Sequence, residues 1–301
     1  MRILGASETE AALPFDRLID ALHLAFTAPA ETPLRHHHAL PDGAMLLLMP
    51  AWQGAHVGVK LVTVHPQNAE LGLRAVHATY LLSDLKTGAP VTLLDGDVLT
   101  ARRTAAASAL AARFLVRSDA RRLLVMGAGR VASLLAEAHA ASWAVETVEV
   151  WNRTPEGAER LASVLRARGL DARAVSDRRE ALARADVVSS ATLSAEPLIE
   201  GAWLRPGTHV DLVGAYTPAM READTATLER ASVFADTEAA LHECGELAGW
   251  NRADLTGTLE TLCRKEMPGR RSTAELTVFK SVGTGLEDLA AAKLALAGSP
   301  R

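Results

Sequence analysis

Hydrophobic and polar positions follow two different patterns along this chain, and the change between them separates a first region from a second. Over residues 10–28 apolar side chains recur every three or four positions, which predicts a helix. Beyond it, short apolar or alternating runs predict strands, with a hairpin turn at 84–88. The predicted strands lie at 44–64 with a break at Pro50, at 75–83 and at 90–94. We therefore expect the first hundred residues to form a mostly antiparallel module with one leading helix.

The second region alternates short apolar runs with helical segments from residue 121 to about 240. Because strands that alternate with helices form parallel sheets, this pattern predicts a Rossmann-type, doubly wound α/β sheet. The predicted strands are at 122–126, 146–151, about 172–175, 186–190, 208–213 and 232–235. An alanine-rich helix over 100–115 precedes this region, and a final helix starts at Thr284, with Glu287 in a capping-box position.

A glycine turn joins the predicted strand 122–126 to the helix that follows it. Gly127 permits a sharp turn, Gly129 lets backbone N–H groups approach a pyrophosphate, and the small Ala132 stands where a third glycine is usual. The helix N-terminus adds unpaired N–H groups and a partial positive charge. We therefore predict a nicotinamide dinucleotide cofactor, held by Gly127, Ala128, Gly129, Arg130 and Val131.

The carboxyl end of the next strand is where such a fold contacts the adenosine ribose. An acid there binds a free 2′-hydroxyl, whereas an arginine pairs with a 2′-phosphate. Asn152, Arg153 and Thr154 follow this strand, and Glu149 lies too early in it to reach the ribose. We expect NADPH in preference to NADH, with NADH use left open. The alternative is an ordinary turn in which Thr154 caps a helix that starts at Pro155.

Three cations of the first region are candidates for holding an anionic substrate. Lys60 lies in an apolar strand, where a buried ammonium is costly unless an anion meets it. Arg103 lies near the start of the helix 100–115, a poor place for a cation unless it faces an anion. With Arg35, in a loop, they could converge on a carboxylate. Alternatively, Lys60 extends to solvent, Arg103 pairs with Asp97, and Arg35 is solvated.

Histidines give weaker signals. His77 lies mid-strand and is either a substrate contact or a core histidine, which is the preferred interpretation. Three consecutive histidines, 36–38, cannot all face one metal on a regular element, so we expect a solvated or pocket-edge loop and no metal site. Asp95 and Asp97 flank Gly96 and are expected to serve a turn.

Composition narrows the classes of partner. The net charge of −4 gives no electrostatic basis for binding nucleic acid or an anionic membrane, and 4% aromatic residues offer little material for base stacking. The two cysteines, Cys244 and Cys263, suggest neither a metal site nor a disulfide framework. Neither a secretory signal nor a membrane-spanning apolar stretch is found, so a cytoplasmic location is expected.

Segments spread over nearly the whole chain resemble the ornithine cyclodeaminase/mu-crystallin family. The run around Arg103 is the most specific of them, and the glycine turn the least. The matching segments are 58–60, 99–106, 127–129, 152–154 and 273–283. The resemblance implies a homodimer with an NAD(P)-binding domain at 118–283. A substrate-binding and dimerisation domain would comprise 1–117 and the returning helix 284–301.

The resemblance also implies roles for single residues. Arg35, Lys60 and Arg103 would hold the substrate carboxylate, and Thr104, Val213 and Gly283 would contact the cofactor. Thr192, after the strand 186–190, is expected to line the cofactor crevice or simply to end the strand.

Two departures select a branch of this family. Cyclodeaminases carry an aspartate where this chain has Tyr216, and a glutamate before a Met-Pro pair where it has Leu47 and Leu48. Without those carboxylates the second ammonium of ornithine has no evident partner. The run 214–222 instead resembles the Δ1-pyrroline-2-carboxylate and ketimine reductase branch.

The sequence therefore predicts an NAD(P)H-dependent reductase of cyclic imino acids. Hydride transfer from NADPH to the C=N carbon of Δ1-pyrroline-2-carboxylate would give L-proline, and the six-membered imine that gives L-pipecolate stays open. Lys60, Arg103 and Tyr216 are the expected catalytic residues, with Tyr216 as either proton donor or pocket wall. Two alternatives remain: a cyclodeaminase-type lyase with recycled NAD, and a non-catalytic NADPH-binding protein.

Overall fold

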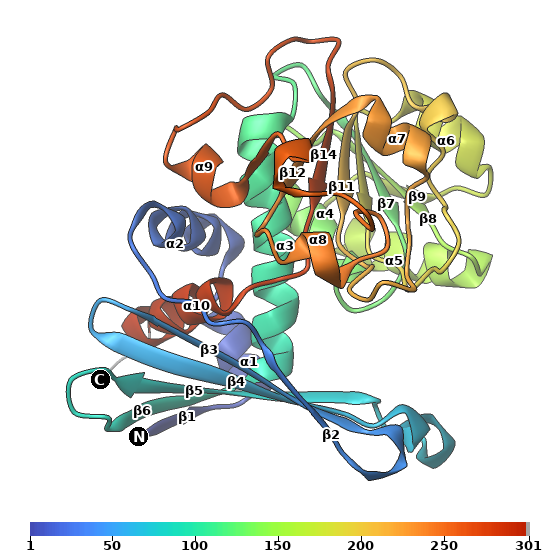
Figure 1. Cartoon of the computed structure of the whole chain (residues 1–301). Coiled ribbons are helices and arrows are strands. Elements are labelled where there is room, and N and C mark those ends of the chain that lie inside the picture. The colour runs from blue at the N-terminus through green and yellow to red at the C-terminus, as the bar shows by residue number, and fades with distance from the viewer. Residues whose placement is uncertain (299–301) are drawn as a thin grey trace. The chain divides into compact units, whose positions relative to one another are not determined.

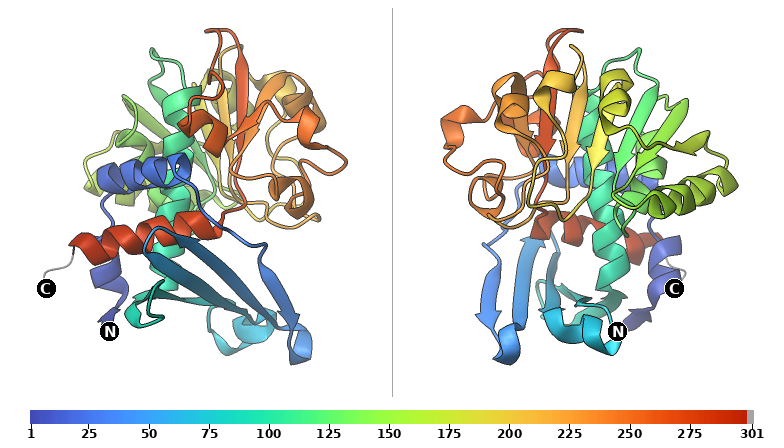
Figure 2. Two further views of the ribbon diagram at one scale, coloured as in Figure 1. Left: turned by 60° about the vertical axis from the view of Figure 1, so that its left-hand side comes forward. Right: turned by 90° about the vertical axis from the view of Figure 1, so that its right-hand side faces the viewer.

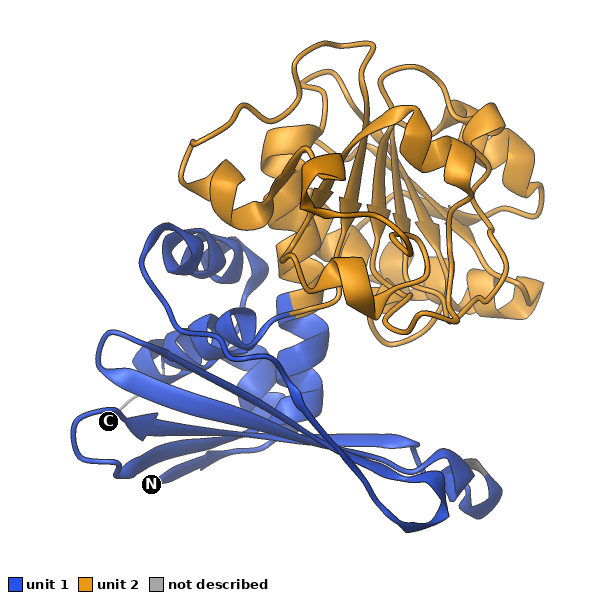
Figure 3. Cartoon of the chain, in the orientation of Figure 1, with its two compact units in different colours: residues 1–103, 284–301 blue, residues 104–283 orange. Residues whose placement is uncertain are grey.

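The computed structural model describes residues 1–298, the side chain of Ala69 apart, and the chain forms two compact units (Figure 3). Unit 1 comprises residues 1–103 and 284–301, and unit 2 comprises residues 104–283. The chain crosses between the units inside helix α3 (Gly96–Leu115) and just before helix α10 (Gly285–Gly298). The sequence placed the first boundary after α3, at residue 117, whereas the compact units divide within that helix.

Unit 1 is built on a six-stranded sheet, shown in Figure 1, in which only the pair β1–β6 is parallel. The predicted mostly antiparallel module is therefore confirmed. In spatial order the strands are β1 (Arg2–Leu4), β6 (Pro90–Asp95), β5 (Val76–Asp84), β4 (His56–Val64), β3 (Met45–Gln53) and β2 (His36–Ala39). Unit 1 also contains helices α1 (Ala6–Ala11), α2 (Phe15–Thr27) and α10, the start of α3, and short 3₁₀ turns at Pro41–Gly43 and Pro66–Leu71.

Two prolines explain where the predicted elements of unit 1 were wrong. The single helix 10–28 is two helices, because Pro14 is extended and stands as the N-cap of α2. Pro50 does not break its strand: β2 pairs with β3 only as far as Leu48, so the missing N–H of Pro50 falls on an open edge. The histidines 36–38 form β2 rather than a loop, although all three are exposed as expected.

Alternation along the strands gives the sheet of unit 1 one buried face and one open face. Lys60 and Tyr80 are cross-strand neighbours on the buried face, against which α10 packs. His77 pairs with Thr63 and points to the opposite face, where it is exposed. The interpretation of His77 as a core histidine is therefore wrong.

Unit 2 contains an eight-stranded sheet whose strands are all parallel, which confirms the predicted doubly wound α/β fold (Figure 2). In spatial order the strands are β13 (Gly257–Thr258), β12 (Ala231–Ala235), β14 (Leu276–Lys280), β11 (His209–Leu212), β10 (Val187–Ser190), β7 (Arg122–Met126), β8 (Thr147–Trp151) and β9 (Ala172–Ala174). Strands β13 and β14 were not predicted from the sequence. The fully buried β14 inserts between β11 and β12.

Short helices connect the strands of this sheet. They are α4 (Ala132–Ala140), α5 (Pro155–Ala167), α6 (Arg178–Arg184), α7 (Thr225–Glu229), α8 (Ala240–Glu243) and α9 (Leu259–Cys263), with 3₁₀ turns at Gly201–Trp203 and Arg252–Asp254. Within the described part of the chain, no helix combines the length and the apolar character needed to span a bilayer.

The two helices at the crossings begin differently from the predictions. Asp95 caps α3 by accepting a hydrogen bond from the Val98 N–H (2.9 Å), so this helix starts four residues before Thr100. Arg103 thus lies beyond the first turn, where the helix dipole has little effect on it. At α10 the Thr284 hydroxyl accepts from the Leu286 N–H (3.3 Å), but Glu287 is buried against Arg103 and forms no capping box.

Replacement of Gly58 by alanine is expected to destabilise unit 1. A Cβ at this position would lie 2.1 Å from the Tyr80 hydroxyl oxygen, and Tyr80 is fully buried. We expect the free energy of unfolding in urea to fall by about 1–3 kcal/mol, as for an overpacked core. As a control, the added methyl of Gly298→Ala would meet nothing closer than Arg17 Nη1 at 3.9 Å and should cost no stability. Equal unfolding curves for the two variants would contradict this packing argument.

Candidate functional site

A cluster of buried charges lies within unit 1. Lys60 Nζ lies 2.8 Å from Asp288 Oδ2, and Arg103 donates through Nε to Asp288 Oδ1 (2.8 Å) and through Nη1 to Glu287 Oε2 (2.5 Å). All four side chains are almost wholly buried. The sheet register puts Lys60 on the inner face, and α10 presents the two acids to it from the other end of the chain. The protein itself thus supplies the anions that burial of Lys60 requires.

The alternative pairing of Arg103 with Asp97 is wrong. Asp97 instead pairs with Arg74 at 2.7 Å, on a more exposed part of the unit. Asp97 lies in the first turn of α3, whereas Arg103 is almost two turns further along, which takes the two side chains to different surroundings.

Burial and neighbouring charges act against each other in this cluster. Desolvation is the main cause that lowers the pKa of Lys60 to about 8; Asp288 opposes this fall, and the charges of Arg103 and Arg35 contribute to it. Burial also disfavours the charge of Arg103, but Asp288 and Glu287 more than offset it and raise the pKa of Arg103 above its ordinary value. Arg35, which is half-buried, is therefore near enough to act on Lys60. Three cations and two acids leave these five groups with one positive charge.

Tyr80 belongs to the same buried face and was missed by sequence reasoning. Its hydroxyl is buried and finds no hydrogen-bond partner among the described residues. Burial and the Asp288 charge raise its pKa well above the ordinary value, so the group stays protonated. Tyr80 pairs with Lys60 across the two strands, so a prediction of this register from the sequence could have placed it on the buried face. His77, by contrast, faces the other way, and the structure does not bring it together with Lys60.

The glycine turn of unit 2 forms a cradle of backbone N–H groups. Gly127 has a φ of +106°, and a Cβ there would lie 2.7 Å from the carbonyl oxygen of Ala191, so glycine is required. Nothing lies within 4 Å of a Cβ built on Gly129. The N–H groups of Ala128, Gly129 and Val131 have no hydrogen-bond partner among the described residues, just before α4 begins. An open, donor-rich helix N-terminus of this kind fits a phosphate.

The segment after β8 carries an exposed cation on an ordered turn. Asn152 Nδ2 donates to the carbonyl oxygen (3.0 Å) and hydroxyl (2.8 Å) of Thr154, which stands as the N-cap of α5. Arg153 is exposed and makes no ion pair or side-chain hydrogen bond with any described residue. Glu149 is buried and bound by Arg173 (2.6 Å) and Arg184 (2.9 Å), so its carboxylate is committed within the unit.

The loops after β10 and β11 are joined by one buried acid, Glu222. Its Oε1 accepts from the Thr192 N–H (2.7 Å) and hydroxyl (2.8 Å), and its Oε2 accepts from the Gly214 N–H (2.6 Å). The N–H of Val213, the residue before Gly214, donates to the carbonyl oxygen of Ser190. Glu222 ends the run 214–222, and no role was predicted for it from the sequence.

The remaining predicted residues lie in varied surroundings. Gly283 has a φ of +81°, and its N–H donates to Asp236 Oδ2 (2.5 Å), so this amide is already used by the protein. Thr104 is buried in α3 at the start of unit 2, and Tyr216 is 47% exposed in the loop after β11. Among the described residues no group of three or more histidine, cysteine, aspartate or glutamate side chains could hold a metal ion.

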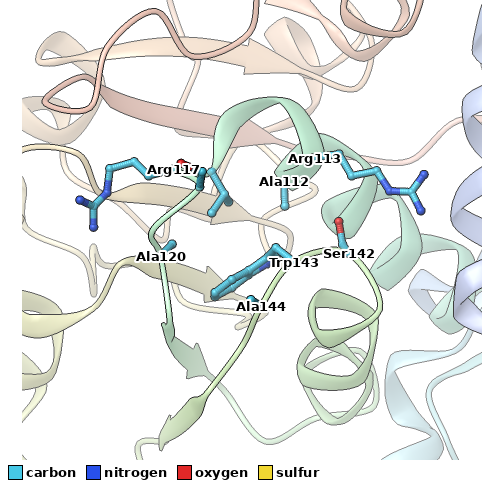
Figure 4. Close-up of a pocket in the computed structure, with 9 residues that line it drawn as sticks. Ala112, Arg113, Arg117, Ala120, Ser142, Trp143 and Ala144 are labelled. Carbon is cyan, nitrogen blue, oxygen red and sulfur yellow. The ribbon is translucent and has the colours of Figure 1, made fainter.

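A separate cavity of about 320 Å³ lies in unit 2, at the amino ends of strands β7 and β8 (Figure 4). It is lined by the end of α3, by residues 116–118 and 120, which precede β7, and by residues 142–144, which precede β8. Figure 4 shows Trp143 between Arg113 and Arg117, whose guanidinium groups point to opposite sides. Because doubly wound sheets bind ligands at the carboxyl ends of their strands, this cavity is not part of the candidate site.

The chain is similar to known proteins over nearly its whole length. A model of the ornithine cyclodeaminase/mu-crystallin family matches residues 2–296. A Δ1-pyrroline-2-carboxylate reductase of Paracoccus denitrificans is 38% identical over 297 residues, which cover 96% of this chain and 94% of that protein. The ketimine reductase mu-crystallin of Rattus norvegicus is 36% identical over 285 residues, covering 88% and 89%.

A solved structure is similar over almost the whole chain. It is the Δ1-pyrroline-2-carboxylate reductase of Thermococcus litoralis in complex with NADH and L-proline, with a TM-score of 0.93 and 31% identity. The similarity covers 99% of this chain and 97% of that one.

The Asp288→Asn variant is expected to lose about 3–5 kcal/mol of unfolding free energy, measured by urea denaturation. The neutral amide could not balance the charges of the two buried cations that Asp288 now bridges. The control is Glu159→Gln, which breaks an exposed ion pair with Arg166 (2.6 Å) and should cost about 1 kcal/mol or less. If both variants lost the same small amount, the buried cluster would not depend on this charge.

Proposed function

Because the chain belongs to the ornithine cyclodeaminase/mu-crystallin family, we propose that it is an NADPH-dependent reductase of cyclic 2-imino acids. The substrate is Δ1-pyrroline-2-carboxylate, which is reduced to L-proline, and the six-membered homologue would give L-pipecolate. The observation that carries the proposal is the buried cluster of Lys60, Arg103, Glu287 and Asp288, which together with Arg35 keeps one positive charge. One small carboxylate would neutralise it.

The cations have hydrogen-bond donors left for that carboxylate. A lysine has three N–H donors and an arginine five, while the acids of α10 take one from Lys60 and two from Arg103. The two acids hold both cations in fixed rotamers, so binding the substrate requires little further ordering. We propose that Lys60 and Arg103, assisted by Arg35, bind and orient the substrate in this way.

The reaction transfers one hydride to the substrate and converts its protonated imine into an amine. When bound, the dihydronicotinamide supplies the hydride, and the protonated imine accepts it at the C=N carbon. Lys60 and Arg103 fix the carboxylate beside that carbon and thereby set the angle of attack. Tyr216 stays a candidate proton donor or pocket wall, whereas His77 is dropped because it faces the open side of the sheet. In unit 2, the amides at 128–131 would hold the pyrophosphate, with Thr192 and Val213 lining the crevice.

Arg153 supports the choice of NADPH. It is exposed and uncommitted at the end of β8, and the acid nearest in that strand, Glu149, is bound elsewhere. The relative from Thermococcus litoralis was solved with NADH, so the choice of phosphate is a proposal for this chain alone. We assign the 2′-phosphate to Arg153, with Asn152 and Thr154 shaping the turn below it.

A second copy of the chain is the proposed partner. The open face of the sheet in unit 1 carries Ile3 (67% exposed), Leu61 (42% exposed) and the half-buried Leu48, Leu81 and Leu93. A contiguous apolar face of this kind suits a homodimer interface. Sedimentation velocity would measure the dimer directly.

The proposed reaction is tested by following absorbance at 340 nm with purified protein. NADPH should be oxidised in the presence of Δ1-pyrroline-2-carboxylate, with one equivalent of L-proline formed, and Δ1-piperideine-2-carboxylate tests the six-membered ring. Release of ammonia from ornithine without net cofactor oxidation would favour the lyase instead. Binding of NADPH without turnover of any imino acid would favour a binding protein.

Arg153→Ala is expected to raise KM for NADPH about 10- to 100-fold and to leave KM for NADH nearly unchanged. The removed group is the proposed partner of the 2′-phosphate, and a hydrogen bond to a charged group contributes about 1.5–3 kcal/mol. Arg160→Ala is the matched control, since Arg160 is an exposed arginine further along α5. Equal losses for both cofactors would contradict the assignment of Arg153.

The pH dependence of kcat/KM should reflect Lys60. This lysine carries its positive charge below its pKa of about 8 and is neutral above it, so carboxylate binding weakens as pH rises through about 8. In Lys60→Arg the guanidinium stays charged, and the fall should move to higher pH even if the rate is lower. Titration of the imine itself is common to both enzymes. Superimposable pH profiles would therefore exclude Lys60 as the titrating group.

A further inference from the structure

We infer that Glu222 is a positioning residue that fixes the two loops of the nicotinamide half of the cofactor site. The inference rests on the proposed function, because it assumes that unit 2 binds a nicotinamide dinucleotide. Glu222 acts through the loops after β10 and β11 and touches neither substrate nor cofactor itself.

Both oxygens of the Glu222 carboxylate accept more than one hydrogen bond. Oε1 accepts from the hydroxyl of Ser190 (2.6 Å) and from the N–H (2.7 Å) and hydroxyl (2.8 Å) of Thr192. Oε2 accepts from the N–H groups of Gly214 (2.6 Å) and Ala215 (3.3 Å). One oxygen thus holds the end of β10, and the other holds the loop after β11, so a single rigid group sets the distance between them.

The two loops are also packed directly on each other. A Cβ built on Gly214 would lie 1.9 Å from the carbonyl oxygen of Thr192, so only glycine allows this approach. The backbone of Glu222 is also hydrogen-bonded, since its N–H donates to Glu246 Oε1 (2.7 Å). Its carbonyl oxygen accepts from the N–H groups of Leu198 (2.8 Å) and Ile199 (2.9 Å).

A buried lysine supports the charge of this acid. Burial raises the pKa of Glu222, while Lys280 and the hydrogen bonds from Ser190 and Thr192 act in the opposite direction. Lys280 ends β14 and lies 3.7 Å from Glu246 Oε2, with all three side chains out of contact with water. The position of β14 between β11 and β12 thus brings a cation to the base of the two loops.

The location in the sheet assigns these loops to one half of the cofactor. A doubly wound dinucleotide fold consists of two mononucleotide-binding halves, and the glycine turn after β7 with the end of β8 serves the adenosine half. The loops after β10 and β11 lie on the other side of β7 in the strand order, and therefore belong to the nicotinamide half. Loss of Glu222 should disturb that half alone.

The test compares two ligands on paired variants of the full-length protein. Glu222→Gln replaces one carboxylate oxygen by an amide N–H₂, which cannot accept hydrogen bonds. The donors of one loop therefore lose their partner, and that loop is released. We expect Kd for NADPH, measured by calorimetry, to rise at least about tenfold. Kd for adenosine 2′,5′-bisphosphate, which lacks the nicotinamide half, should change by less than about twofold. At saturating NADPH, kcat should fall as well, because the ring is less well oriented.

The chain provides a matched control. Asp211 is a fully buried acid on β11 that accepts a hydrogen bond from Ser189, just as Glu222 accepts one from Ser190 on the same strand. The Asp211 carboxylate makes no hydrogen bond to either loop in the described residues. Asp211→Asn should therefore lower stability without a selective effect on NADPH.

A milder pair keeps the inference testable if Glu222→Gln does not fold. Ser190→Ala removes one donor from Glu222 Oε1 and should weaken NADPH binding about three- to tenfold, whereas Ser189→Ala should not. Equal weakening of NADPH and of the bisphosphate in Glu222→Gln, or equal NADPH affinities in the two serine variants, would overturn the inference. If the wild-type protein bound the bisphosphate but not NADPH or NADH, the proposed function would fail, and this inference with it.

Discussion

The cost of burying charge is the constraint on which the rest of this structure depends. Lys60 and Arg103 are almost out of contact with water, and they can be charged there because Glu287 and Asp288 meet them at 2.5–2.8 Å. These acids lie in α10, at the far end of the chain, so the pairing also ties the last helix to the sheet of unit 1. Together with Arg35, the cluster keeps a positive charge that a small carboxylate would complete.

The same constraint shapes the loops of unit 2 with the signs reversed. There Glu222 and Asp236 are buried acids, and backbone N–H groups donate hydrogen bonds to both. Glu222 binds the loops after β10 and β11, and Asp236 binds the N–H groups of Val282 (2.8 Å) and Gly283 (2.5 Å). Burial raises the pKa of both acids; hydrogen bonds from Thr192 to Glu222, and from Val282 and Gly283 to Asp236, oppose the rise. A site that must present its backbone in a fixed shape gains that rigidity from buried hydrogen bonds.

Much of this architecture could be predicted from local patterns. Alternation and apolar runs gave most strands, and the glycine turn lies where a phosphate cradle requires it, with Gly127 at φ +106°. The errors occurred where a distant partner decides the outcome. Pro50 continues its strand because the pairing of β3 with β2 extends only to Leu48, and β14 is a strand because β11 and β12 flank it. Glu287 pairs with Arg103 instead of forming a capping box.

The sequence by itself determined the fold class, the family and the residue types at the two half-sites, because hydrophobic period, glycine positions and local motifs depend on near neighbours in the chain. It also singled out Lys60 and Arg103 as cations in need of an anion. Only the tertiary structure decided which anions meet them, that His77 faces away, and that Glu222 joins two loops. These outcomes depend on groups far apart in the chain, and a buried charge or amide finds its partner only when the strands and helices have packed.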